Sequence, residues 1–147
     1  MISLSALMTF VHLLGLVLGV GAATVKLVLL LKCRADHLFV PVYLRVVRPI
    51  SRMIVLGMIL LTLSGIVILL FGYPWSQLLL VKLILVGAIW VLGPVIDNVV
   101  EPKFSAYSVQ TDATASAAFL RVQQQYLTME VVATGLFYVI IGLWVLL

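Results

Sequence analysis

The sequence predicts an all-α fold, namely an integral membrane four-helix antiparallel bundle with both termini on the periplasmic or outer side. Hydrophobic residues make up 65% of the 147 residues and charged residues only 10%, whereas a soluble domain carries about 25% charged residues. Four long apolar stretches fill almost the whole chain, and each is long enough for the about 20 residues that a spanning helix requires. Lysine and arginine gather in alternate connections, which indicates orientation in a membrane.

Polar residues and a proline delimit the first two helices of this single transmembrane domain, residues 1–147. The first helix is expected over about residues 3–32, up to a short polar stretch. Its apolar run is too long for the hydrophobic region of a signal peptide and has no basic start, so we expect it to remain uncleaved. The second helix is expected over about residues 51–71, because Pro49 precedes it and proline is favoured at a helix start.

The last two helices are delimited by a turn signal and by a second polar connection. The third helix is expected over about residues 75–99, between the turn of residues 72–75 and Pro102. The fourth is expected over about residues 114–147, which at 1.5 Å per residue is about 50 Å, longer than the bilayer requires. Three residues are acceptable N-caps for it: Thr111, Asp112 and Thr114.

Orientation follows from the basic residues, which remain on the cytoplasmic side of a membrane. They flank the first and third connections, whereas the connection of residues 72–76 and both extreme termini contain none. The basic residues concerned are Lys32, Arg34, Arg45, Arg48, Arg52, Lys103 and Arg121. We therefore expect a multi-pass protein of the bacterial inner (cytoplasmic) membrane with its basic loops cytoplasmic. The net charge of +4 then reflects topology, so the expected partner is the lipid bilayer and not a nucleic acid.

Polar residues recur at one depth in the outer half of the predicted bundle. Counting from the outer helix ends places His12 about 14 Å deep and Lys82 about 10 Å deep, with Ser64 and Tyr138 at a similar level. An ionisable group inside a membrane costs several kcal/mol unless it faces the bundle or water, so such groups indicate function. The plainer alternatives are that His12 hydrogen-bonds to Ser64 or Tyr138, and that Lys82 extends its ammonium to the interface.

Two glycines share a helix face with His12. Gly15 and Gly19 follow it at helical spacing, which clears a groove along the first helix. The groove can accept a neighbouring helix, as small-xxx-small contacts do, or a planar ligand whose metal is bound by the imidazole. The packing role is the commoner one. The candidate cofactor site therefore comprises His12, Gly15, Gly19, Ser64, Lys82 and Tyr138, with His12 as the candidate metal ligand.

Opposite charges lie near the predicted cytoplasmic ends of the helices. Lys26, Asp97, Glu130 and Arg121 are expected to form ion pairs that hold these ends in register. A proton or ion path from the carboxylates outward to His12 is the functional alternative. It is disfavoured, because no carboxylate occurs in the outer half of any predicted span.

Motifs for soluble-type catalysis are absent from the sequence: there is no GxSxG, HExxH, GxGxxG or P-loop pattern. No catalytic residue is therefore predicted. Cys33 is the only cysteine, which excludes an intramolecular disulfide. Haem b is the one specific cofactor that the polar layer suggests. His37 is expected on the opposite side of the membrane from His12, so a single chain supplies one histidine ligand.

The stretch of residues 11–23, VHLLGLVLGVGAA, resembles the first helix of small bacterial four-helix membrane proteins. These include the copper-resistance protein D-like proteins and the HemJ-type protoporphyrinogen oxidases. Trp75 followed by Lys82 is similar to a segment that opens a later helix in HemJ-like proteins. The resemblance implies an association with haem and porphyrinogen oxidation, with functional roles for His12 and Lys82. HemJ-like proteins carry further histidines and an aromatic-rich first helix, which this chain lacks.

Two functional hypotheses follow. In the first, which we favour, the protein is a structural, assembly or accessory subunit of a homo-oligomer or of a larger membrane complex. In the second, it is a b-type haem or porphyrin-binding membrane protein, a HemJ-like oxidoreductase that uses His12 and Lys82. The accessory-subunit hypothesis accords with the small size of the chain and with the lack of a second histidine ligand. The haem hypothesis accords with the shared depth of His12 and Lys82.

Overall fold

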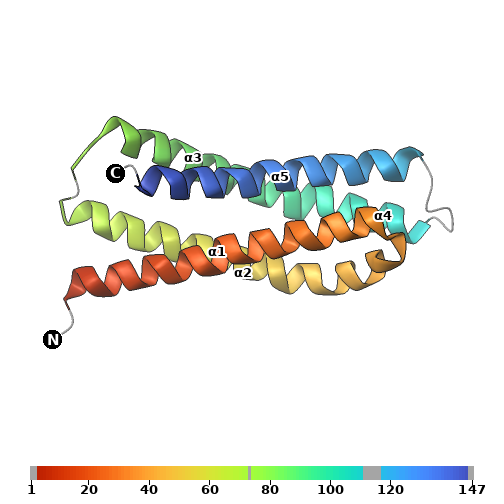
Figure 1. The fold of residues 1–147 in the computed structure, drawn as a ribbon, viewed down its shortest axis with the longest axis horizontal. Helices are drawn as coiled ribbons and strands as arrows, with labels where there is room; N and C mark the ends of the chain where they lie inside the picture. Colours follow the sequence, from red (N-terminus) through yellow and green to blue (C-terminus); the bar gives the residue numbers. More distant parts are fainter. Residues whose placement is uncertain (1–2, 73, 111–116, 146–147) are drawn as a thin grey trace.

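The structure, a computed structural model, describes residues 3–72, 74–110 and 117–145 (Figure 1). Its elements, in chain order, are α1 (Leu4–Ala35), the 3₁₀ turn η1 (His37–Phe39), α2 (Val40–Leu70), α3 (Gln77–Val95), the π-helical segment η2 (Ile96–Val100), α4 (Glu101–Gln110) and α5 (Ala117–Val145). Because α3, η2 and α4 follow one another without a gap, these elements form four long rods. Each rod contains a helix long and apolar enough to cross a membrane.

The four rods lie side by side and alternate in direction (Figure 1). The start of α1, the connection between α2 and α3, and the end of α5 share one end of the bundle, here called the terminal end. The end of α1, the start of α2, the end of α4 and the start of α5 share the other end, here called the basic end. This arrangement is the all-helical antiparallel bundle that the apolar stretches predict.

Side-chain caps explain where two of the helices begin. The Ser3 hydroxyl accepts a hydrogen bond of 3.2 Å from the Ala6 amide at the start of α1. The Ser76 hydroxyl accepts one of 3.1 Å from the Leu79 amide at the start of α3. Such caps satisfy amide groups that have no partner inside the helix. Gly72 ends the second rod with a φ of 95°, a conformation that costs glycine little.

The second helix begins earlier than the sequence suggested. It starts at Val40, and Pro41 occupies its first turn, where a missing amide proton costs nothing. Pro49, the expected start, lies inside the helix. A proline removes one hydrogen bond from a helix interior. The long helix around it keeps the other backbone groups paired, as an apolar environment requires.

The third rod continues past its expected end near residue 99. The chain passes through the π-helical segment Ile96–Val100 and then runs as α4 to Gln110. Pro102 lies in the first turn of α4, so it is compatible with helix there. Because this segment is polar, the sequence predicted a connection here, but the segment forms the helix α4. The three expected N-caps of the last helix, Thr111, Asp112 and Thr114, lie outside the described residues.

Glycine permits a close approach of α1 and α2. A Cβ built at Gly15 would lie 2.9 Å from the Gly57 carbonyl oxygen, and one built at Gly57 would lie 2.5 Å from the Gly19 Cα. Both separations are shorter than the about 3.5–4.0 Å of an ordinary contact between carbon atoms. The α1–α2 pair is also the most extensive helix contact in the described part of the chain. The groove of Gly15 and Gly19 is therefore filled by α2.

The buried side chains form two groups along the bundle. An aromatic group at the basic end includes Tyr43, Phe104 and Tyr126, all fully buried. A mainly aliphatic group near the middle, here called the aliphatic layer, includes Met58, Ile89 and the aromatic ring of Phe137. Two polar sites lie beside these groups, one between the aliphatic layer and the terminal end and the other at the basic end.

Candidate functional site

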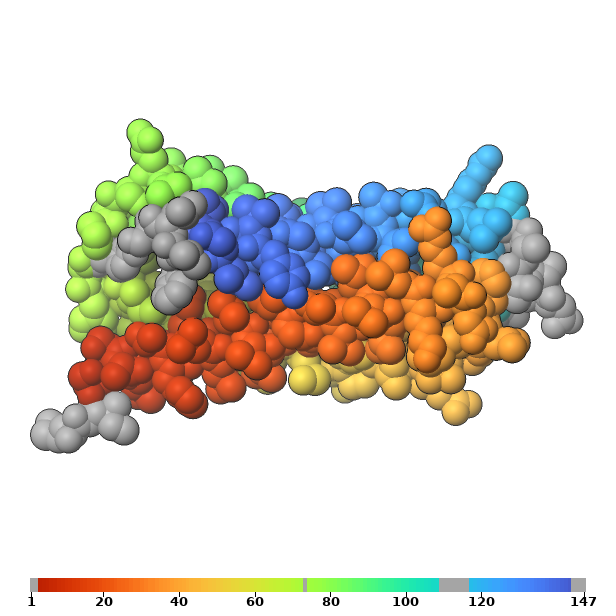
Figure 2. Space-filling view, viewed as in Figure 1, coloured from red at the N-terminus to blue at the C-terminus, as the bar shows by residue number. Residues whose placement is uncertain are grey.

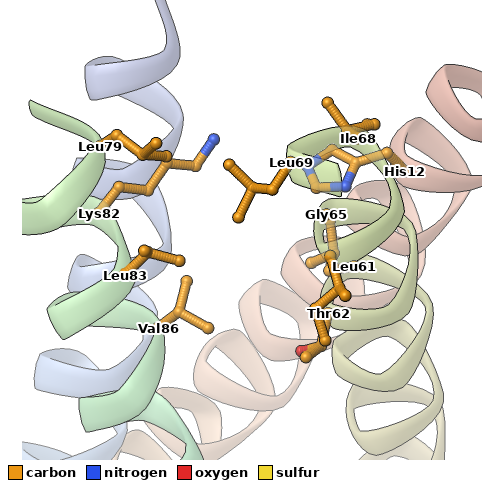
Figure 3. A pocket seen from close by; sticks show the side chains of 11 residues that line it. His12, Leu61, Thr62, Gly65, Ile68, Leu69, Leu79, Lys82, Leu83 and Val86 are labelled. Atoms are coloured by element: carbon orange, nitrogen blue, oxygen red, sulfur yellow. The ribbon is translucent and has the colours of Figure 1, made fainter. Parts of the chain in front are cut away.

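A cavity of about 170 Å³ lies between α2 and α3 near the terminal end, with His12 of α1 at its edge (Figure 3). Its walls are mainly aliphatic side chains: Leu61, Ile66, Ile68, Leu69, Leu79, Leu83 and Val86. A smaller cavity of about 70 Å³ shares His12, Leu61 and Lys82 with it and extends toward the middle of the bundle. We call these two adjoining cavities, which share lining residues, the outer pocket.

The outer pocket exists because α2 and α3 approach each other only slightly along the described residues, although they are consecutive. α2 packs instead on α1, and α3 on α5. One hydrogen bond of 3.0 Å, from Trp90 Nε1 to Thr62 Oγ1, links α3 to α2 near the smaller cavity. The aliphatic layer of Met58, Ile89 and Phe137 borders that cavity from the middle of the bundle.

His12 is held by Ser64, the partner that one of the sequence-based alternatives named. Its Nδ1 lies 2.8 Å from Ser64 Oγ, and the Ser64 hydroxyl donates to the Leu60 carbonyl at 2.5 Å. A serine hydroxyl has one proton, so when it donates to the carbonyl it accepts from His12 Nδ1. The imidazole is therefore fixed through Nδ1, and Nε2 remains for other partners.

Lys82 reaches the same cavity from the opposite wall. Figure 3 shows its ammonium and a ring nitrogen of His12 directed into the space between the helices. Lys82 forms no ion pair or hydrogen bond with any described residue. The acidic residues of the described ranges all belong to the half of the bundle at the basic end: Asp36, Asp97, Glu101 and Glu130. The structure thus places an ammonium in an apolar pocket where none of the described residues supplies a counterion.

Not every residue of the predicted cofactor site joins the pocket. Gly15 and Gly19 face Gly57 of α2. The Tyr138 hydroxyl is 2.9 Å from Thr24 Oγ1, about three helical turns beyond His12 along α1. The depth count went wrong for Tyr138 because α5 ends short of the start of α1 (Figure 1). His12, Ser64 and Lys82 remain together.

These residues do not fit a haem. The expected cradle of Gly15 and Gly19 has no room for a porphyrin, because backbone atoms of α2 fill it. A cavity of about 170 Å³ is also too small to enclose a porphyrin. Among the described residues, no three His, Cys, Asp or Glu side chains are grouped so as to hold a metal ion. His12 would be a single ligand without a second.

A second polar site, the inner charge cluster, surrounds Lys26 at the basic end. The Lys26 ammonium is 2.8 Å from Asp97 Oδ1, 2.8 Å from Glu130 Oε1 and 3.4 Å from Glu101 Oε2. The Lys26 side chain is 2% exposed. Ion pairs in this setting are weakly screened. The cluster therefore joins α1, η2, α4 and α5.

Hydroxyl groups extend the inner charge cluster beyond what the sequence suggested. Tyr126 donates a hydrogen bond of 3.1 Å to Glu101 and lies 2.7 Å from the hydroxyl of Tyr43. Ser51 donates to Asp97 at 3.2 Å. The sequence places Glu101 near the same helix ends, but Glu101 was not among the expected ion pairs, although its i, i+4 spacing from Asp97 was a usable signal. Helix α4 continues after η2, so both carboxylates face the same lysine.

Arg121 was expected in the inner charge cluster and does not join it. Arg121 is exposed, and it forms none of the ion pairs found among the described residues. It lies in the second turn of α5 as described, more than two turns from Glu130. The single buried cation of the cluster is Lys26.

Comparison of the chain with protein-family models, with curated proteins and with solved structures found no match.

Proposed function

We propose that the protein is an accessory subunit of the bacterial inner membrane whose outer pocket binds an anionic amphiphile. The proposed ligand has a carboxylate or phosphate head and an apolar chain. The observation that carries the proposal is the ammonium of Lys82, which lacks a counterion among the described residues and lines an apolar cavity.

The charge of Lys82 supplies the binding energy for the head group. A lysine at the centre of a spanning helix costs about 2.5–3.5 kcal/mol on insertion scales, and Lys82, in the second turn of α3, costs less than that. An anion placed beside it forms a charge-assisted hydrogen bond and offsets part of that cost. His12 Nε2 lies at the same cavity as a second polar group. Its role is to orient the head, since Ser64 fixes the ring.

The walls of the outer pocket suit the apolar part of such a ligand. Aliphatic side chains of α2 and α3 form most of the lining. The slight contact between these two helices leaves the cavity accessible from the bilayer side. A chain-bearing molecule can enter there without leaving the membrane, because its tail remains among lipid chains while its head meets Lys82.

The proposal includes the sidedness that the basic residues predict, with the terminal end outside and the basic end in the cytoplasm. Alkaline phosphatase fused to either terminus should be active, and the same enzyme inserted after Arg34 should be inactive. Active enzyme at the Arg34 position would show the opposite orientation.

The apolar outer faces of the four rods suit contact with lipid, a second copy or another membrane subunit.

The binding test compares a pyrene-labelled fatty acid with its methyl ester, using the purified protein in detergent. The two probes share the same chain and differ in the charged head. We expect the acid to bind at least ~10-fold more tightly, which corresponds to about 1.4 kcal/mol. Lys82→Met should abolish this preference while the bundle remains folded.

Lys32→Met is the matched control, because Lys32 is exposed near the basic end, where its ammonium lies over the Phe39 ring. It should leave the preference for the acid intact. Equal affinity for acid and ester, or an unchanged preference in Lys82→Met, would refute the proposal. A haem Soret band in the purified protein, lost in His12→Gln, would instead support the haem hypothesis.

A further inference from the structure

The inner charge cluster contains more negative than positive groups. Three carboxylates, those of Asp97, Glu101 and Glu130, lie within 3.4 Å of the single ammonium of Lys26. No other lysine or arginine of the described ranges forms an ion pair with them. The side chains of Lys26 and Glu130 are 2% and 4% exposed, whereas those of Glu101 and Asp97 are 12% and 28% exposed. The excess negative charge is therefore most costly at Glu130, where binding of a proton or another cation would offset it.

A small cavity lies beside the cluster and is large enough for one such guest. Its volume is about 30 Å³, and Lys26, Asp97, Glu130 and Thr134 are among the residues that line it. One water-sized guest needs roughly 10–15 Å³ measured in this way. The cavity is therefore within the range of a water molecule or a partly dehydrated small ion.

Thr134 indicates that the cavity holds a polar guest. The residue is 3% exposed, and its Oγ1 has no hydrogen-bond partner among the described residues. Buried hydroxyl groups nearly always have a partner, and most threonines inside helices find one in a carbonyl of the preceding turn. Thr128, one and a half turns earlier in α5, does so by donating to the Gln124 carbonyl at 2.9 Å. The Thr134 hydroxyl is thus available to a ligand in the cavity.

We propose that this cavity is a binding site for one exchangeable monovalent cation, a proton or a sodium ion, held between Glu130 and Thr134. Carboxylate and hydroxyl oxygens are the donors that hard cations prefer. In the proton form, Glu130 carries the proton, and a water molecule in the cavity links the resulting carboxyl group to the Thr134 hydroxyl. In the sodium form, both oxygens bind the ion directly or through water.

The remaining charged and titratable groups around the site come from every rod that packs there: Lys26 of α1, Tyr43 of α2, Asp97 of η2, Glu101 of α4 and Tyr126 of α5. The site is separate from the outer pocket, because the buried side chains of Met58, Ile89 and Phe137 lie between them and border both. The cation-site proposal therefore stands on its own observations and does not require a ligand at Lys82.

Two measurements on the full-length purified protein distinguish the two cations. Infrared spectroscopy at about pH 7 reports a protonated carboxyl group by its C=O stretching band. Thermal unfolding in sodium chloride against choline chloride, at equal ionic strength, reports specific sodium binding. At ~10-fold excess over its Kd, sodium should raise the Tm by about 3 °C or more.

Three variants connect either signal to this site. Glu130→Gln should remove the protonated carboxyl band or the sodium effect, and Thr134→Val should shift the band or weaken the effect. Thr134→Ser, which keeps the hydroxyl, should restore wild-type behaviour. Thr128→Val is the matched control, because the hydroxyl of this exposed residue bonds to its own helix. It should change neither signal.

A protonated carboxyl band that responds to these variants identifies a proton, and a sodium-specific Tm shift that responds to them identifies sodium. Absence of both signals in the wild-type protein would overturn the proposal. So would a signal that is unchanged in Thr134→Val and in Glu130→Gln. If Glu130→Gln does not fold, the comparison of Thr134→Val with Thr134→Ser still decides the matter.

Discussion

Replacing Gly57 with alanine should force α1 and α2 apart. The added Cβ would lie 2.5 Å from the Gly19 Cα and 2.8 Å from the Gly15 carbonyl oxygen, whereas carbon atoms in contact are normally about 3.5–4.0 Å apart. The obstructing atoms belong to the backbone, so no side chain can rotate out of the way. The two helices must separate by about 1 Å at their closest point.

The expected cost of Gly57→Ala follows from two opposing terms. Overpacking of this kind costs about 1–3 kcal/mol, and the better helix propensity of alanine returns up to about 1 kcal/mol. We therefore expect a net loss of about 1–2 kcal/mol in the free energy of unfolding, which lowers Tm by about 3–6 °C in a chain of this size. Thermal unfolding in detergent, followed by circular dichroism, measures it.

Gly21→Ala is the control for this experiment. Gly21 lies on α1 close to Gly19, and a Cβ there would meet nothing within 4 Å. Its Tm should stay at the wild-type value or rise slightly. If Gly57→Ala proves as stable as Gly21→Ala, the close helix contact described here would be refuted.

Four further substitutions test other contacts by the same thermal assay, and Ser64→Ala is also tested by ligand binding. Lys26→Met leaves three carboxylates without their cation and should cost about 3–5 kcal/mol; a wild-type Tm would show that the ion pairs do not form. Tyr126→Phe should cost about 1–3 kcal/mol and more than Tyr43→Phe, because the Tyr126 hydroxyl contacts both Tyr43 and a carboxylate; the reverse order would contradict this network. Ser64→Ala removes the hydrogen bond that holds the imidazole of His12, so it should weaken ligand binding in the outer pocket and cost about 1 kcal/mol of stability. An unchanged affinity for the fatty acid would exclude a positioning role for this hydrogen bond.

The class of the fold could be predicted from composition and apolar run length, because the backbone in an apolar environment has few alternatives to helix. The helix ends could not. Pro49 was taken as a helix start, but Pro41 precedes it in the same rod and fits the first turn. Local rules for proline allow both positions, and only packing of the complete rod decides between them.

The candidate sites were predictable to different degrees. Counting residues from the helix ends brought His12 and Lys82 together because α1 and α3 both begin at the terminal end, and each residue lies only a few turns from that start. The same count failed for Tyr138, since the level of α5 relative to its neighbours depends on packing. The cluster around Lys26 was visible as opposite charges at one depth. Its excess of carboxylates emerged only from the structure, which places Glu101 beside the lysine and leaves Arg121 outside the cluster.

The glycine face of α1 illustrates a choice that sequence could not make. A groove beside His12 accepts either a helix or a flat ligand, and the residues on α1 are the same in both cases. The partner glycine, Gly57, lies far away in the sequence on α2. Its position opposite Gly15 and Gly19 depends on where α2 begins, which the sequence-based boundary misplaced.

Native mass spectrometry of the protein, released from mild detergent after incubation with a fatty acid, tests the central claim most directly. The account predicts one bound fatty acid on the wild-type protein and on Lys32→Met, and loss of the bound species in Lys82→Met. A wild-type protein that carries no ligand, or a Lys82→Met protein that retains it to the same extent, would contradict the account.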